Sequence, residues 1–403
     1  MRTFLSTLLQ SAALGIALCT GCLAAPFVPQ SDTEVVERLP QRIGTVEQRR
    51  QQREARERLR QQPAQLPLAL QLAREALARA RQLGDPRELG QAQASLAPWW
   101  SLDNPPPAVR LLRATVKQSQ HDFTAALSDL NALLQAGSAA PVAVQAQAEL
   151  TRASVLQVTG RWALATQGCE RLAGPRYAAL GDAVQLPAQA CLAELSSLQG
   201  HADQAEQRLR QLAQRSGADN TWLTLVRAEL AERRGDDSAQ RLYREALQTP
   251  TPDVYTLAAY ADWLLERGRH AEVITLLAGR DDADALLLRL AIAHQRNHDA
   301  LADTAAATLA ARFDAAALRG DRSHGREQAR FELELRGNAA AALTHAQANW
   351  AVQKEPADAL VLVRAATAAH RPEAAEPVWR LMRESGWQDA RLQATPTPAR
   401  AKS

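Results

Sequence analysis

The apolar residues of this chain recur at helical spacing, in segments that are separated by short polar, proline-containing or glycine-containing stretches. From about Leu66 onward such segments follow one another. One runs from Leu68 to Leu83 and ends where Gly84-Asp85-Pro86 interrupts it. The prolines at 105–107 form a loop, because they provide no backbone donors for a helix interior. The pattern predicts a series of helices joined by short connections.

The composition supports an all-α chain. Alanine, leucine, arginine, glutamine and glutamate dominate its 403 residues, and aromatic residues make up only 4%. These residues favour helices, whereas the β-branched runs from which strands are built are few. The formal net charge is only +3, and arginine is interleaved with glutamate. Such mixtures are typical of solvated helix faces, so we expect no nucleic-acid partner.

A small residue recurs at intervals of 34 positions, at Ala205, Ala239 and Val273. Each follows a glycine by four or five positions, and these glycines are Gly200, Gly235 and Gly268. A glycine after a helix permits the left-handed turn conformation, and a small residue in the next helix lets the two helices approach closely. The alternative is an ordinary helical bundle with chance glycines. Two equal intervals favour a repeat.

These positions resemble the tetratricopeptide repeat, a two-helix unit that buries its apolar face by stacking on copies of itself. Further copies of the motif are Gly160 with Ala165, Gly337 with Ala342, and Ala126 after His121 in the glycine place. The helix pair expected at 284–296 and 300–312 lacks a good motif. The resemblance covers residues 64–385 and implies an all-α fold, a right-handed α-solenoid of about eight antiparallel helix pairs with no significant sheet.

The N-terminus has the pattern of an export signal. Arg2 precedes an apolar stretch at 4–18, and a region of small residues follows. We therefore expect a signal peptide over 1–25, too short for a membrane-spanning helix. One processing route is cleavage near Ala24 or Ala25. The other is lipidation of Cys22, because Thr20-Gly21-Cys22 resembles a bacterial lipobox.

Three further regions are expected after the signal. Residues 26–63 contain a linker and a polar, arginine-rich helix, and residues 64–385 contain the repeats. The polar stretch 386–403 is expected to be a disordered tail. The mature protein is expected in the periplasm or envelope of a Gram-negative bacterium, in contact with a membrane only through a lipid on Cys22.

Two cysteines, Cys169 and Cys191, lie outside the signal. Cys169 falls late in the second helix of one repeat and Cys191 early in the first helix of the next. Adjacent antiparallel helices place such positions opposite each other, and an exported protein matures in an oxidising compartment. We expect a disulfide, with two buried free thiols as the alternative.

No motif indicates catalysis or a cofactor. His294 and His298 share a helix face beside Asp299, but a third zinc ligand and a catalytic glutamate are missing, so we interpret them as surface histidines. The basic, glycine-containing stretch 320–326 is interpreted as a loop between repeats rather than an anion site. We expect no metal and no cofactor. An enzymatic site around His294, His298 and His324 is the least favoured hypothesis.

In tetratricopeptide proteins the first helix of each pair lines the concave groove. The resemblance carries ten polar or acidic positions into that groove: Gln147, Ser154, Gln157, Glu194, Ser197, Thr221, Thr224, Tyr255, Asp262 and Glu266. The lysine and asparagine cluster that clamps a peptide's terminal carboxylate is missing, so we expect an extended or helical polypeptide segment instead. The alternative is that these positions are solvated helix faces.

The sequence thus favours a non-enzymatic adaptor or scaffold of the bacterial cell envelope, which binds a protein partner in its groove. The inference from repeat to binding is by fold-level analogy. A lipid-anchored assembly factor of an envelope biogenesis or export machinery is the second hypothesis.

Overall fold

The computed structural model describes residues 45–135, 139–216, 220–318, 320 and 325–393, together with Ser31. The chain divides into two units between Ile43 and Gly44, and every helix described belongs to the second unit. The expected signal peptide, with Cys22, Ala24 and Ala25, lies outside the described residues.

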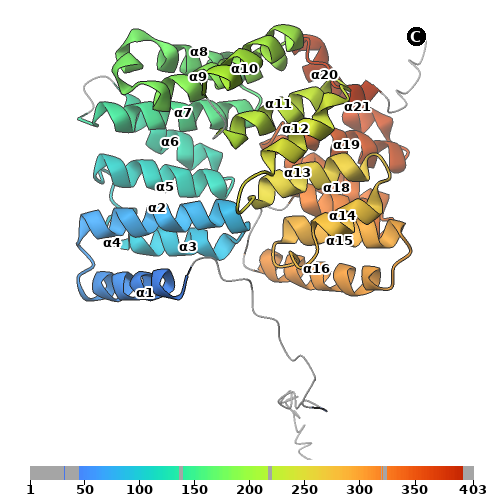
Figure 1. The fold of residues 1–403 in the computed structure, drawn as a ribbon, viewed down its shortest axis with the longest axis horizontal. Helices are drawn as coiled ribbons and strands as arrows, with labels where there is room; N and C mark the ends of the chain where they lie inside the picture. Colours follow the sequence, from blue (N-terminus) through green and yellow to red (C-terminus); the bar gives the residue numbers. More distant parts are fainter. Residues whose placement is uncertain are drawn as a thin grey trace, which may run out of the picture. The chain divides into compact units, whose positions relative to one another are not determined.

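Every regular element within the described ranges is helical (Figure 1). The first half contains α1 (Val46–Gln61), α2 (Leu66–Leu83), α3 (Pro86–Ser95), α4 (Ala97–Trp100), α5 (Pro107–Ser119), α6 (Phe123–Leu134), α7 (Val142–Val158), α8 (Trp162–Ala173), the 3-10 turn Pro175–Leu180, α9 (Asp182–Ser197) and α10 (Ala202–Ser216). The second half contains α11 (Thr221–Arg233), α12 (Ser238–Ala246), α13 (Val254–Leu265), α14 (His270–Leu276), α15 (Asp284–Arg296), α16 (Leu301–Leu318), α17 (Gly325–Arg330), the π-helical Phe331–Leu335, α18 (Ala339–Val352), α19 (Pro356–Ala368), the 3-10 turn Pro372–Ala375, α20 (Glu376–Ser385) and α21 (Ala390–Gln393).

Consecutive helices pack as hairpins, and the second helix of most hairpins packs on the first helix of the next. The hairpins are α2–α3, α5–α6, α7–α8, α9–α10, α11–α12, α13–α14, α15–α16, α17–α18 and α19–α20. The expectation of an all-α array of helix pairs is confirmed. The polar helix α1 belongs to this array, because its Ala55 and Leu59 share a core cluster with Ala69 and Leu72 of α2.

Each hairpin turns on a residue with a positive φ, between 53° and 86°. Six are glycines and three are histidines: Gly84, His121, Gly160, Gly200, Gly235, Gly268, His298, Gly337 and His370. After most of these turns the next residue donates its amide back into the ended helix, as from Asp236 N to Ala231 O at 2.8 Å and from Arg371 N to Ala366 O at 2.8 Å. This is the bond of a Schellman cap. The pair without a recognisable motif therefore has the same turn, at His298.

The small residues after these turns are buried as the repeat requires. Ala205, Ala239 and Val273 are each at most 1% exposed. Because a small side chain leaves room for the facing helix, these positions set the close approach within each hairpin.

Both ends of the array pack against its middle. Gln82 at the end of α2 donates to the carbonyl of Thr251 at 3.5 Å. At the other end, the amide of Lys354 donates to the carbonyl of Val158 at 2.7 Å. Trp387 meets Trp162 edge to face, with ring centroids 6.2 Å apart.

The expected disordered tail from residue 386 is wrong for residues 387–393. Trp387 is 2% exposed, and Asp389 and Leu392 are fully buried. Arg391 binds both Asp389, at 2.7 Å, and Glu232 of α11, at 3.2 Å. Trp387 and Leu392 anchor this polar segment by burial, and Arg391 adds an ion pair with α11. None of the helices within the described ranges is long and apolar enough to cross a membrane.

The contact between the turns at Gly200 and Gly386 gives a test. A Cβ added to Gly200 would lie 3.1 Å from the carbonyl oxygen of Gly386, and the φ of Gly200 is +86°. Gly200→Ala should cost about 1–2 kcal/mol for the left-handed turn and more for the displaced Gly386 backbone. Chemical denaturation measures the loss.

The matched control is Gly279→Ala, because Gly279 has a φ of +69° and no atom within 4 Å of the added Cβ. It should show the cost of the turn alone. Equal losses in the two variants would mean that the contact between Gly200 and Gly386 contributes nothing to stability.

Candidate binding site

A hollow of about 300 Å³ lies where α9, α11 and α13 meet residues of α15, α17, the segment before α19, and α21. Four positions of the expected groove line it: Gln157, Glu194, Tyr255 and Asp262. The charged residues of its lining also include Arg81, Glu229, Glu232, Arg233, Arg289, Arg326, Glu327, Lys354, Glu355 and Arg391. The expected groove is therefore partly covered by later helices of the same chain.

Three acids in this lining occupy the same place in successive repeats. Glu194, Glu229 and Asp262 each lie six positions before a turn glycine, at Gly200, Gly235 and Gly268. Since the hairpins stack, the same position of each first helix falls on the same face of the array. The repeat thus aligns three carboxylates.

Asp262 is bound by two arginines. Its Oδ2 accepts from Nη2 of Arg289 at 2.6 Å, and its Oδ1 accepts from Nη1 of Arg330 at 2.7 Å. Burial alone would raise the pKa of Asp262, but the two guanidinium groups lower it to about 2. Asp262 is therefore ionised and fully paired.

Two neighbouring acids are paired in the same way. Glu266 accepts from Nη1 of Arg364 at 2.6 Å. Glu232 lies 3.2 Å from Nη1 of Arg391 and accepts from the hydroxyl of Tyr243 at 2.5 Å. Arginines of α17, α19 and α21 thus satisfy acids of α11 and α13.

Glu194 and Glu229 form no ion pair with any described residue. Oε1 of Glu229 accepts from the hydroxyl of Tyr255 at 2.7 Å. The pKa of Glu229 is raised to about 7, mainly by burial and further by Glu194 and Glu232, against the hydrogen bond from Tyr255 and the charge of Arg233. Tyr255 is 55% exposed, so its ring is open to an occupant.

The remaining expected groove residues do not line the hollow. Ser197 is buried and accepts from Nη2 of Arg233 at 3.1 Å. Ser154 donates to the carbonyl of Leu150 at 3.2 Å, and Gln147 is exposed, with its amide 3.5 Å from Thr151. Thr221 and Thr224 lie on α11, outside the lining.

Sequence reasoning missed Glu229, Arg289, Arg326, Lys354 and Arg391 in this lining. Glu229 could have been found, because it has the register of Glu194 and Asp262. The four basic residues lie in other hairpins or near the C-terminus, where the repeat position does not indicate an inward side chain.

The interpretation of His294 as a surface histidine is wrong. Its side chain is buried, and Nδ1 lies 2.8 Å from Oδ2 of Asp299. His298 is the left-handed turn residue of its hairpin, with a φ of 56°. The two imidazoles therefore have separate structural roles. In the parts of the chain that the structure describes, no group of three or more potential ligands is arranged to hold a metal. His324 lies outside those parts.

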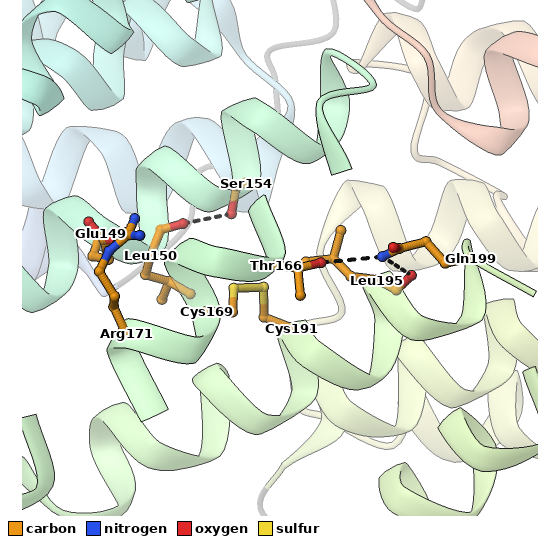
Figure 2. The surroundings of a disulfide bond; sticks show 9 residues. All are labelled: Glu149, Leu150, Ser154, Thr166, Cys169, Arg171, Cys191, Leu195 and Gln199. Atoms are coloured by element: carbon orange, nitrogen blue, oxygen red, sulfur yellow. Dashed lines mark hydrogen bonds and ion pairs between the residues drawn. A yellow bond between two sulfur atoms is a disulfide. The ribbon is translucent and has the colours of Figure 1, made fainter. Parts of the chain in front are cut away.

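Cys169 of α8 and Cys191 of α9 are joined by a disulfide, with Cα atoms 6.2 Å apart (Figure 2). Gln199 extends the same contact between the hairpins, because its amide donates to Oγ1 of Thr166 at 3.2 Å. The bond closes a loop with a sequence separation of 22. It links consecutive hairpins beside α7.

No protein-family model matches the chain. No curated protein matches its sequence. Among solved structures, the chain is similar to the tetratricopeptide repeat domain of P58(IPK), with 14% sequence identity and a TM-score of 0.21. The match covers 83% of this chain and 93% of that chain. A TM-score this low does not support a fold assignment, so the evidence for the repeat architecture is the turns and the packing described above.

The raised pKa of Glu229 predicts that Glu229→Gln increases the stability of the fold, and that the increase depends on pH. Between an ordinary value near 4.5 and about 7, the folded protein holds a proton that the unfolded chain releases, so wild-type stability falls as the pH rises. The variant lacks this loss while its amide oxygen still accepts from Tyr255. Its melting temperature should therefore rise relative to wild type at pH 8, with a smaller difference at pH 5.

Glu384→Gln is the control, because Glu384 is exposed and lies outside the lining. It should show no such change with pH. The same difference between Glu229→Gln and wild type at both pH values would show that Glu229 titrates normally.

The disulfide is tested by alkylating the denatured protein before and after reduction, with mass spectrometry of the peptides that contain Cys169 and Cys191. Neither should be alkylated before reduction. Cys169→Ser should cost about 3 kcal/mol of unfolding free energy, since the bond closes a loop of about 20 residues. Alkylation of both cysteines without reduction would contradict the bond.

Proposed function

We propose that this chain is a non-enzymatic scaffold of the bacterial cell envelope that holds a segment of a partner protein at the hollow. The observation that carries the proposal is the hollow itself, which lies on the face made by the first helices of the central repeats. It presents a half-exposed tyrosine, Tyr255, and two acids that form no ion pair with a described residue, Glu194 and Glu229. A stack of helix pairs offers such a face for holding another molecule.

The hollow favours a side chain or short segment over a long helix. Its volume of about 300 Å³ is at the lower end of ligand sites in proteins. Arginines from α15, α17, α19 and α21 already pair with acids on the inner face. A partner therefore inserts a small part of itself and makes its remaining contacts outside.

An exported location is part of the proposal. It is supported by the signal-like sequence at 1–25 and by the Cys169–Cys191 disulfide, since disulfides persist in oxidising compartments. Cleavage near Ala24 or Ala25 and lipidation of Cys22 are the two routes by which the chain would reach the envelope.

Site-specific photo-cross-linking tests the scaffold. Alanine at Asp262 is unsuitable, because it would leave Arg289 and Arg330 without their carboxylate. A benzoylphenylalanine in place of Tyr255 keeps an aromatic ring at the hollow. It should give a discrete adduct with one envelope protein on irradiation of cells.

The control places the same cross-linker at Leu164 of α8, which is 44% exposed and lies outside the lining. It should not give that adduct. No adduct from position 255, or identical adducts from both positions, would contradict the scaffold.

A further inference from the structure

We propose that the hollow receives an arginine or lysine side chain of the partner, whose cationic group pairs with Glu194 and Glu229. This rests on the proposed scaffold function, and it specifies the chemistry of the contact. Three observations lead to it: how the chain satisfies the neighbouring acids, what it leaves unpaired, and the ring beside them.

Within the chain, several acids of this face are paired with arginines. Asp262 takes Arg289 and Arg330, at 2.6 and 2.7 Å. Glu266 is paired with Arg364, and Glu232 with Arg391. Each of these acids on α11 and α13 therefore receives a guanidinium group from a later helix. Guanidinium and carboxylate groups match in charge and in hydrogen-bond geometry.

The series stops at Glu194 and Glu229. They share the register of Asp262, six positions before a turn glycine, yet neither forms an ion pair with a described residue. The charge of the nearby Arg233 lowers the pKa of Glu229, but its Nη2 donates to Ser197 and to neither carboxylate. Arg391 binds Glu232 and Asp389. Glu194 and Glu229 are half-buried and repel each other, so an entering cation would be stabilised because it offsets that repulsion.

Tyr255 supplies the third feature. Its hydroxyl is held by Glu229 at 2.7 Å, while 55% of its surface remains exposed in the lining. A cation that approaches these carboxylates can also lie against the ring, whose face attracts positive charge. The same chain already places guanidinium groups on aromatic rings, as with Arg267 over Trp263 at 3.9 Å from the ring centroid.

An anionic occupant is the competing possibility, because Arg81, Arg233 and Lys354 also line the hollow without an ion pair to a described residue. They come from three separate elements, α2, α11 and the segment before α19. Glu194 and Glu229, in contrast, repel each other enough to raise the pKa of Glu229 further. The shared register of Glu194 and Glu229 on stacked helices favours a cation, and the test includes an anion.

The experiment uses the full chain and three probes: Nα-acetyl-arginine methylamide, its neutral citrulline counterpart, and Nα-acetyl-glutamate methylamide. Binding is followed by saturation-transfer NMR at pH 8. The arginine probe should bind about tenfold or more tightly than citrulline, the factor expected for one charge-assisted contact. The glutamate probe should not bind.

Glu194→Gln with Glu229→Gln should weaken the arginine probe about tenfold or more, whereas Glu384→Gln should leave it unchanged. In the wild-type protein, binding should weaken between pH 8 and pH 5.5 as Glu229 takes up a proton. This second measurement needs no variant that could misfold.

Equal binding of arginine and citrulline, preferred binding of glutamate, or no binding at tens of millimolar would each overturn the proposal. The two proposals fail separately. A cross-link from position 255 that persists in the double glutamine variant would support the scaffold function and contradict the cation site. Arginine binding without any cross-linked partner would support the cation site and contradict the scaffold function.

Discussion

The pairing of C-terminal arginines with acids of the central helices is the interaction on which the inner face depends. Arg330 reaches Asp262 across 68 positions of the chain, and Arg364 reaches Glu266 across 98. Buried charges are tolerated only when each is paired and hydrogen-bonded, so these contacts fix how the later helices lie on the earlier ones. Removing one partner would leave an uncompensated charge. Loss of one of these pairs would therefore weaken the packing of the later helices on the inner face.

The turns explain why the array is irregular in sequence but regular in structure. Successive turn residues are 30 positions apart from Gly268 to His298, but 40 apart from Gly160 to Gly200. The required feature is a residue that accepts a positive φ after the first helix, with a buried small residue in the second. Histidine meets the first requirement at a higher cost than glycine. His370 followed by the buried Ala375 shows that the motif survives without its glycine.

The local part of the fold could be predicted from the sequence. Helical periodicity, turn residues and small residues at Ala205, Ala239 and Val273 depend on neighbours within one hairpin. The packing of the C-terminal helices on the central ones could not be predicted. It depends on contacts between side chains of hairpins that are far apart in the sequence. Asp262 illustrates the limit: its position in the groove followed from the register, but its pairing with Arg289 and Arg330 required the structure. Trp387 could not be placed for the same reason.

Closure also changes what kind of recognition the repeats can support. An open groove selects a partner by length and by many weak contacts along several repeats. Here the chain's own arginines pair with several acids of the inner face, and a small hollow remains whose lining includes Tyr255 and the acids Glu194 and Glu229, which form no ion pair with a described residue. A binding site of that size would discriminate by charge and by the shape of a single side chain. Since burial and neighbouring acids raise the pKa of Glu229 to about 7, its charge, and with it the strength of any cation contact, would change around neutral pH.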